Sequence, residues 1–395
     1  MALASPPLAP EQVKIALVIK DFSGRRGGGE GYAFRLALEL ARLGHEIHVY
    51  ANSWDKPEEE GLFYHRVPMV RRSSMLKLIS FPRNAGRLLK EGRFDVINGL
   101  TQVLEQDVFR LGGGVAKHWL DVRARFSPFP FLIRMRPLNL INLFIERRIF
   151  TGGRCRRFIV NSKLCRGHLK KYYGVPGDRI DLVYNGVDTE RFNPEVVRRH
   201  RAEMRAALGV KDDEMLVLTA SSNPKRKGLG SIIAALAALG EAGRKVKLLA
   251  VGSNRVSSFR RRAASLGLGE RVILKGWSGG IERCYGAADI FVLPTMYDPF
   301  ANVCLEALAS GLPVITTWEN GAAEVVESTG GGAVIGDHDD VTALAAAIKA
   351  MTDRDAREAV AERAASGAGS FTWDRTARAV LEVYEKVIEE KRVAP

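Results

Sequence analysis

The sequence predicts an α/β protein with two doubly wound domains. Its 395 residues exceed what a single hydrophobic core usually serves, so two domains are the first expectation. Short apolar runs, typical of strands buried in a parallel sheet, alternate with segments of helical periodicity. This alternation begins near residue 15 and begins again near residue 215, which indicates two consecutive α/β series.

The first series opens with a βαβ unit. The apolar run at 15–19 predicts a strand, and a glycine-rich stretch at 24–31 follows it. Apolar residues then recur at helical spacing until Gly44 ends the helix, and 47–51 predicts the next strand. This order requires a parallel sheet. Further strands are expected at 94–97 and 158–160.

The second series repeats the pattern after a hinge at 184–194. Its strands are expected at 215–220, 246–251, 272–274, 290–293 and 313–316, with helices between them. An amphipathic helix from Trp373 to about Lys391 ends the chain. Ligands of such sheets bind at the carboxyl ends of the strands, so we expect a cleft between two sheets that face each other.

Two carboxylates flank the start of a predicted helix at 302–310. Asp298 precedes this helix and Glu306 lies on its first turns. The backbone N–H groups at its start, which stabilise anions, belong to Phe300, Ala301, Asn302 and Val303. A diphosphate is such an anion, and the carboxylates can accept hydrogen bonds from hydroxyl groups. The alternative is an acidic turn that only complements the helix dipole.

A basic loop follows the strand predicted at 215–220. It reads Lys225-Arg-Lys-Gly228, and its glycine permits close approach of a diphosphate to the backbone. A solvated basic turn is the alternative. The earlier glycine loop at 27–31 matches neither a dinucleotide-binding fingerprint nor a P-loop, so by itself it indicates only a small-residue turn before a helix.

The segment Tyr297–Thr316 resembles the signature of the family 4 retaining glycosyltransferases. That family shows two glutamates separated by seven residues, and this chain has Asp298 in place of the first and Glu306 as the second. Three further segments fit the family in order: Gly27–Gly29, Asn185–Asp188 with Arg191, and Lys225–Gly228. The resemblance covers nearly the whole chain and is greatest to bacterial glucosyltransferases of the lipopolysaccharide core.

This resemblance implies the GT-B fold: an acceptor domain of residues 1–185 with a crossover helix at 375–395, and a donor domain of 186–374. It implies that a retaining, metal-independent enzyme transfers a sugar, glucose from a UDP-sugar, without a cofactor. Candidate catalytic residues are Asp298, Lys227, Arg226 and, near the acceptor, His118. Candidate substrate-binding residues are Gly28, Gly29, Arg191, Gly276, Trp277, Phe300, Ala301, Asn302, Val303 and Glu306.

Some of these assignments have open alternatives. Other members place an acceptor-facing His or Asp where this chain has Gly113, so Asp107 competes with His118, which can equally be a packing residue. Trp277 can equally belong to the core. The shorter Asp298 reaches roughly 1.5 Å less than a glutamate, which leaves the donor sugar open; GDP-mannose or another donor, for capsule or glycolipid synthesis, is the rival.

Positive charge is concentrated in the first half of the chain. Residues 1–200 hold 34 Lys+Arg against 20 Asp+Glu, whereas residues 201–395 hold 25 of each. Between residues 70 and 172 the cations are mixed with aromatic and aliphatic residues, as in Arg123–Arg136. This mixture suits an anionic membrane surface that carries a lipid-linked glycan acceptor. RNA or DNA is the alternative, but no nucleic-acid-binding motif supports it.

The sequence also predicts a cytoplasmic protein, peripheral on the inner face of the membrane. No apolar run reaches the ~18 residues of a transmembrane helix. The start, MALASPPLAPEQ, lacks the basic and apolar regions of a secretory signal. The four cysteines form no C-x-x-C pair, so reduced thiols are expected and a zinc site is not.

Overall fold

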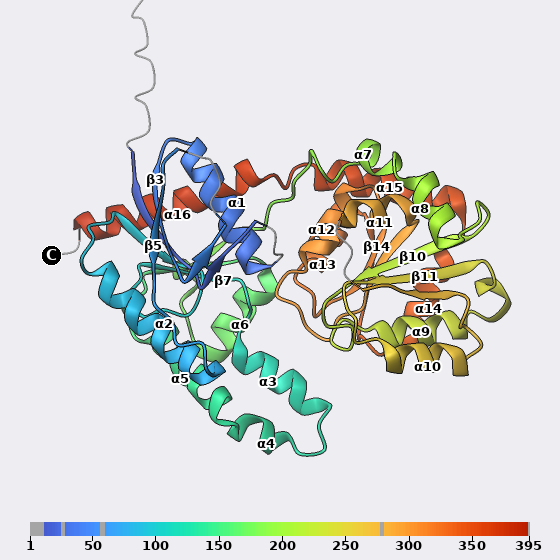
Figure 1. The fold of residues 1–395 in the computed structure, drawn as a ribbon, viewed down its shortest axis with the longest axis horizontal. Helices are drawn as coiled ribbons and strands as arrows, with labels where there is room; N and C mark the ends of the chain where they lie inside the picture. The colour runs from blue at the N-terminus through green and yellow to red at the C-terminus, as the bar shows by residue number, and fades with distance from the viewer. Residues whose placement is uncertain (1–11, 25–27, 56–59, 277–279, 394–395) are drawn as a thin grey trace, which may run out of the picture. The chain divides into compact units, whose positions relative to one another are not determined.

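The structure, a computed structural model, describes residues 12–24, 28–55, 60–276 and 280–393. The chain forms two compact units, each with its own sheet (Figure 1). The first unit comprises the described residues of 1–160, 166–183 and 373–395, and the second comprises 161–165 and those of 184–372. The sequence predicted domain boundaries at 185/186 and 374/375. In the structure the chain passes from one unit to the other at 183/184 and at 372/373. The assignment of 161–165 to the second unit was not expected.

The first unit is built on a seven-stranded parallel sheet with the order β5-β3-β1-β6-β7-β8-β9. Its strands are β1 (Lys14–Val18), β3 (Glu46–Ala51), β5 (Leu62–Arg66), β6 (Val96–Gly99), β7 (Val108–Leu111), β8 (Arg157–Val160) and β9 (Ile180–Leu182). Two short strands, β2 (Asp21–Phe22) and β4 (Ser53–Trp54), extend beyond β1 and β3 and pair with each other.

Helices cover both faces of this sheet. They are α1 (Gly29–Arg42), α2 (Ser74–Leu89), α3 (Ala116–Arg125), α4 (Pro130–Met135), α5 (Pro137–Thr151), α6 (Lys163–Tyr173) and α16 (Trp373–Val393). Alternate residues of β1 belong to two cores. Ile15 and Leu17 pack with α1 and α16, while Ala16 and Val18 pack with α2. The Asn98 amide donates to the Tyr384 hydroxyl (2.5 Å), which fixes α16 to β6.

The second unit has a six-stranded parallel sheet with the order β12-β11-β10-β13-β14-β15. Its strands are β10 (Met215–Ala220), β11 (Val246–Val251), β12 (Val272–Leu274), β13 (Ile290–Leu293), β14 (Val314–Thr317) and β15 (Gly332–Ile335). The prediction of two doubly wound α/β domains is therefore confirmed. In both sheets the strand order reverses beside the first strand, which is the arrangement of Rossmann-like folds.

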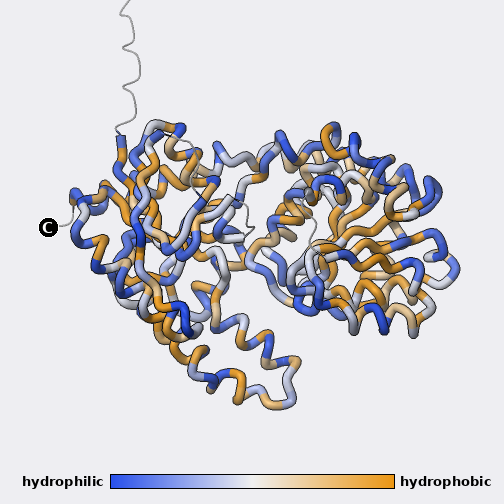
Figure 2. Tube along the Cα trace, viewed as in Figure 1, coloured by the Kyte–Doolittle hydropathy of each residue, from blue (hydrophilic) through white to orange (hydrophobic). Residues whose placement is uncertain are grey.

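Two layers of helices enclose the second sheet. One layer holds α9 (Leu229–Ala238), α10 (Ser257–Ser265) and α14 (Val341–Ala350). The other holds α7 (Pro194–Arg198), α8 (Arg201–Leu208), α11 (Ile281–Ala287), α12 (Asn302–Ala309), α13 (Ala323–Thr329) and α15 (Arg354–Ala368). The central strands are apolar along their length, since both of their faces are covered (Figure 2).

No helix in the described part of the chain is long and apolar enough to cross a membrane. All four cysteines are buried and unpaired with one another.

Candidate active site

The second unit brings its basic loop and its acidic loop together at one point. β10 and β13 are adjacent, and the strand order reverses between them. The basic loop leaves the carboxyl end of β10, and the segment that contains Asp298 leaves the carboxyl end of β13. Ligands of open α/β sheets bind where the order reverses, because the two connecting chains diverge there and leave a crevice.

Gly228 allows the basic loop to pass close to β13. Its φ is 77°, in the left-handed region that favours glycine. A Cβ atom at this position would meet the Pro294 carbonyl oxygen at 2.0 Å. The backbone of the neighbouring Arg226 accepts a hydrogen bond from the Met296 N–H (2.9 Å), which joins the two loops. The glycine therefore fixes the position of Lys227, the residue before it.

Lys227 and Asp298 form a buried ion pair. The Lys227 ammonium donates to Asp298 Oδ2, and each residue is 8% exposed. The Arg226 guanidinium lies 3.5 Å from the same oxygen. Two cations thus share one carboxylate, which leaves net positive charge and unused Lys227 donors at the crevice. A diphosphate could accept them there.

The start of α12 offers fewer N–H groups than the sequence suggested. The Phe300 N–H donates to Asp298 Oδ1 and the Ala301 N–H donates to Asn320 Oδ1, both at 3.1 Å. Those two groups already have partners within the protein, so their assignment to the diphosphate stays a prediction. The N–H groups of Asn302 and Val303 have no hydrogen-bond partner within the described residues. They remain available to an anion at the helix N-terminus.

Glu306 lies on the second turn of α12 and is partly buried. The Tyr285 hydroxyl donates to Glu306 Oε2 (3.0 Å). Burial raises the pKa of the Glu306 carboxyl above its usual value, although the Tyr285 hydrogen bond and the charge of Arg191 oppose this. Hydrogen bonds from new hydroxyl donors, such as those of a ribose, stabilise a carboxylate most when water solvates it poorly.

Two further candidates lie in the second unit. The Arg191 guanidinium forms an ion pair with Glu282 (2.6 Å) and lies over the Phe192 ring, 4.8 Å from its centroid. Arg191 is therefore held beside α11 by protein groups. Gly276 lies against Asn254, whose Oδ1 would be 2.0 Å from an added Cβ atom. Trp277 lies outside the described residues.

In the first unit, Gly28 and Gly29 begin α1. Gly28 has a φ of 74°, and beyond the local backbone no atom of the described residues lies within 4 Å of where a Cβ on either glycine would stand. The turn therefore leaves open space at the carboxyl edge of the sheet.

His118 is not in a glycine loop but inside α3, where it is 5% exposed. Its ring stacks on His168 with centroids 3.7 Å apart, and its Nδ1 lies 3.2 Å from the Tyr172 hydroxyl. The sequence left a packing role open for His118, and this contact fits that role. The assignment of His118 to the acceptor stays a prediction. Its rival Asp107 accepts hydrogen bonds from the Ile97 N–H and from Lys391, and so joins β6 to α16.

Known proteins match this chain along most of its length. Residues 26–191 match the family described as "Glycosyltransferase Family 4", and residues 200–367 match "Glycosyl transferases group 1". A probable transglycosylase of Burkholderia thailandensis is 30% identical over 305 residues, which cover 76% of each chain. The chain belongs to the family 4 glycosyltransferases.

Other relatives of this family 4 glycosyltransferase have named activities or ligands. The lipopolysaccharide glucosyltransferase WaaG of Escherichia coli is 26% identical, covering 86% of this chain and 90% of its own length. A crystal structure of WaaG matches 94% of this chain and 99% of its own with a TM-score of 0.80 at 22% identity. The structure of the Anabaena protein HepE in complex with UDP-glucose covers 97% of this chain and 100% of its own chain, with a TM-score of 0.69 at 18% identity. These matches show that the two units form the GT-B fold.

Sequence reasoning missed the residues that hold the family motif in shape. Asn320 is buried and accepts the N–H groups of Ala301 and Ala322, while its amide donates to Thr316. Tyr285 supports Glu306 from α11. Neither residue lies inside the motif, and an asparagine after a strand or a tyrosine in a helix carries no distinctive sequence signal.

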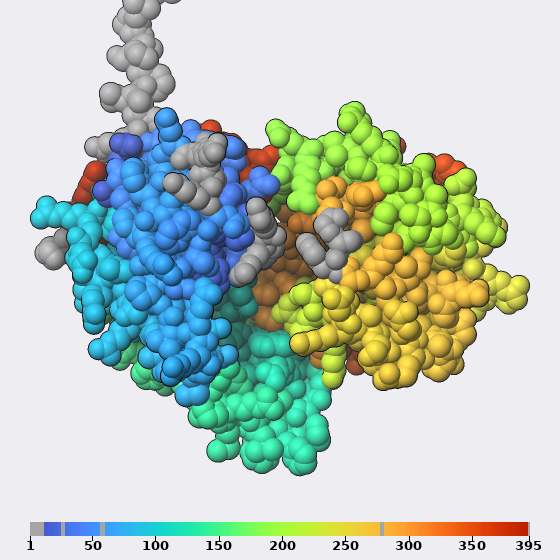
Figure 3. Space-filling model, in the orientation of Figure 1, coloured from blue at the N-terminus to red at the C-terminus, as the bar shows by residue number. Residues whose placement is uncertain are grey.

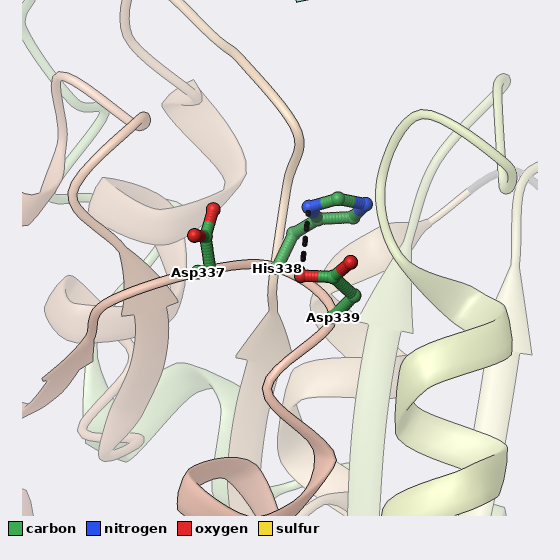
Figure 4. Close-up of side chains that lie close together, drawn as sticks. All are labelled: Asp337, His338 and Asp339. Carbon is green, nitrogen blue, oxygen red and sulfur yellow. Dashed lines mark ion pairs between the residues drawn. The ribbon is translucent and has the colours of Figure 1, made fainter. Parts of the chain in front are cut away.

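One surface turn of the glycosyltransferase places three potential metal ligands together. Asp337, His338 and Asp339 lie between β15 and α14, with ligand atoms within 4.8 Å of one another (Figure 4). His338 Nδ1 lies 3.8 Å from Asp339 Oδ1. Adjacent carboxylates on an exposed turn are common in proteins without a bound ion, so we assign this turn no metal.

Proposed function

We propose that this glycosyltransferase moves a hexose, glucose, from a UDP-sugar to a lipid-anchored glycan such as the lipopolysaccharide core, with retention of the anomeric configuration and without a divalent metal. The observation that carries the donor half of this proposal is the buried Lys227–Asp298 pair with Arg226 beside it. UDP and UDP-glucose are ligands of the HepE structures, and WaaG is named as a lipopolysaccharide glucosyltransferase.

The residues present suit this chemistry. Lys227, Arg226 and the N–H groups of Asn302 and Val303 stabilise the departing diphosphate electrostatically, in the role that a metal has in other enzymes. Glu306 accepts the ribose hydroxyls, and Asp298 faces the donor sugar. The bond from the anomeric carbon to the diphosphate breaks and a bond to the acceptor oxygen forms on the same face. The acceptor proton passes to the leaving phosphate oxygen, so no nucleophilic side chain is required.

The acceptor half rests on the surface of α3, α4 and α5. Large apolar side chains there are 50–65% exposed: Phe126, Phe129, Phe131, Leu132, Met135, Leu140 and Phe144. Arginines are interspersed with them along the chain, and α3 and α4 extend away from the sheet of their own unit (Figure 1). The same segment forms a projecting lobe in the space-filling view (Figure 3). Exposed aromatics beside cations favour an anionic bilayer, where the rings enter the interface and the cations attract lipid phosphates.

A donor screen tests the proposal. We expect the purified protein with chelator to hydrolyse UDP-glucose slowly and to release α-glucose first, which proton NMR detects before mutarotation. GDP-mannose and ADP-glucose should turn over more slowly. If GDP-mannose turned over faster than UDP-glucose, GDP-mannose would be the preferred donor. Release of β-glucose first would contradict retention.

A further inference from the structure

The first unit contains a cavity of about 500 Å³ at the carboxyl edge of its sheet. Its wall comes from chain segments that follow β1, β3 and β5, from the first turns of α2 and from the first turns of α5. Its volume is within the range of small-molecule sites. Gly28 and Gly29 begin α1 at the same edge, where ligands of parallel sheets bind.

Three cations line this cavity: Lys20, Arg71 and Lys77. Arg71 is partnered, because its guanidinium donates to Asn52 (2.9 Å) and lies 3.6 Å from Asp21. The ammonium groups of Lys20 and Lys77 make no hydrogen bond or ion pair with any described residue. Asp21 is the single carboxylate among the described residues of the wall, so this described part of the wall carries a net positive charge.

The two lysines repel each other across this space. Burial lowers the pKa of Lys20. The charge of Asp21 opposes this, the charge of Lys77 lowers the pKa further, and the charge of Glu30 raises it. The N-terminus of α2 adds partial positive charge, since Ser74 lines the cavity at its first turn. Three cations that share one carboxylate in a cavity wall are suited to an anion with several acceptor oxygens.

Apolar residues of the same two helices lie exposed beside these cations. Leu76 and Ile79 of α2 are 43% and 50% exposed, and Leu140 and Phe144 of α5 are 52% and 65% exposed. α2 and α5 pack against each other, so these side chains belong to the helices that form the cavity wall. An acceptor that bears both a phosphate and a lipid would satisfy both features.

We infer that this cavity binds a phosphate group carried by the acceptor, through Lys20, Lys77 and the N-terminus of α2. The inference rests on the proposed transferase function, because it assigns the cavity to the acceptor of that reaction. The phosphate can belong to a sugar of the glycan or to the lipid headgroup, and the two sources share the same chemistry.

Calorimetric titration tests the inference with two soluble probes, glucose 6-phosphate and dihexanoylphosphatidylglycerol below its micelle concentration. We expect wild type to bind at least one of them more tightly than its uncharged or zwitterionic counterpart, glucose or dihexanoylphosphatidylcholine. Lys20→Gln and Lys77→Gln should each weaken that binding by about tenfold, the loss expected for one charged hydrogen bond. Neither lysine supports another residue, so both variants should fold.

Arg87→Gln is the matched control, because Arg87 is an exposed cation on α2 that does not line the cavity. It should leave the affinity unchanged. Binding of the sugar phosphate alone assigns the glycan as the source, and binding of the lipid alone assigns the headgroup. Equal weakening by Arg87→Gln, or no preference for either phosphate in wild type, would overturn the inference.

UDP is titrated into the same proteins to separate this inference from the proposed function. UDP affinity should be the same in wild type, Lys20→Gln and Lys77→Gln. Wild type that fails to bind UDP would contradict the proposed function. Loss of UDP binding in Lys77→Gln alone would make the cavity part of the donor site and would overturn the assignment to the acceptor.

Discussion

The Asp298 carboxylate contacts Lys227 and Arg226, the two cations that a diphosphate would also contact. The pair is stable in the absence of donor because each charge neutralises the other in a buried position. When a diphosphate binds, it competes with Asp298 for the same donors, and Asp298 can turn to hydroxyls of the sugar.

Replacing Asp298 should separate binding from transfer. Asp298→Asn removes a negative charge beside the diphosphate and frees Lys227, so UDP should bind up to about tenfold more tightly, as expected for a charge removed at close range. Transfer from a UDP-sugar should fall by about tenfold or more, since a charged hydrogen bond to the sugar is lost. Calorimetry and a product assay measure the two effects, with Asp337→Asn on the exposed turn as the control. Weaker UDP binding in Asp298→Asn would show that Asp298 positions Lys227 for the nucleotide.

Replacing Glu306 with glutamine should raise the stability of the protein and lower its affinity for UDP. Its pKa in the folded protein is raised, so its contribution to stability is present at acidic pH and is lost as the pH rises through the folded pKa. Glu306→Gln keeps an acceptor for the Tyr285 hydroxyl and removes the charge. Its Tm at pH 7.5 should therefore exceed that of wild type by about 1–3 °C, with a smaller difference at pH 5.

UDP affinity of Glu306→Gln should fall, because a neutral amide is a weaker acceptor for ribose hydroxyls than a carboxylate. Thermal melts with and without UDP measure both quantities. A Tm below that of wild type at pH 7.5 would mean that the charged form of Glu306 is already well compensated.

Single residues of the site were predictable where a motif fixes their spacing. Lys227 and Glu306 follow from the sequence, and the structure places Lys227 against Asp298. The supports of the site were not predictable, since Asn320 and Tyr285 reach it only through tertiary contacts. For His118 the sequence left a packing role open beside an acceptor role, and its ring packs against His168 inside the first unit.

Among the elements, the strands β10, β11, β12 and β13 have the bounds that their apolar runs predicted. β5, β7, β9 and β15 were missed, as were the short strands β2 and β4. The patterns of β5 and β15 are weak. β5 reads Leu-Phe-Tyr-His-Arg at the sheet edge and is only partly buried, and β15 begins at a glycine. Edge position does not explain every case, since the edge strand β12 was predicted and β7, buried along its length within the first sheet, was not.

The tight turn before α9 can be tested by its glycine. Gly228→Ala would place a Cβ atom against the Pro294 carbonyl oxygen and would strain a positive φ. We expect a loss of about 1–3 kcal/mol in stability and weaker UDP binding, because Lys227 would shift with the turn. Gly240→Ala is the matched control, since Gly240 also has a positive φ (53°) but has no atom within 4 Å of an added Cβ. If both variants changed UDP affinity equally, the turn at Gly228 would not be part of the donor site.

We predict that the helices α3 and α4 bind the protein to anionic membranes. Wild type should sediment with vesicles that contain phosphatidylglycerol and not with phosphatidylcholine alone. Binding should weaken between about 0.05 and about 0.5 M salt as the Debye length falls roughly threefold. Reversal of Arg123, Arg125, Arg134 and Arg136 to glutamate should abolish it and leave UDP affinity intact.

The control for this reversal has the same change in net charge elsewhere. Arg255, Arg260, Arg261 and Arg262 lie exposed in and before α10 of the second unit. Their reversal to glutamate should leave vesicle binding in place. Equal binding of wild type to anionic and neutral vesicles would point to another partner, and RNA would be tested next.

At the scale of the whole molecule, each unit is a complete doubly wound domain with its own core. The sequence predicted this because the strand–helix alternation restarts after a hinge. It did not predict that residues 161–165 join the second unit, where the Ser162 hydroxyl donates to the Pro299 carbonyl (2.8 Å) and Glu324 accepts from the Lys163 N–H (3.0 Å). Such contacts depend on side chains more than a hundred residues apart.

The central claim is that the crevice beside Lys227 binds a nucleoside diphosphate without metal, and calorimetric titration of UDP in the presence of chelator tests it most directly. Wild type should bind UDP under these conditions, Lys227→Ala should bind it more weakly by about 1.5–3 kcal/mol, and Lys225→Ala, at an exposed position of the same loop, should bind it nearly as wild type does. Binding that disappears in chelator, or wild-type affinity in Lys227→Ala, would contradict the account.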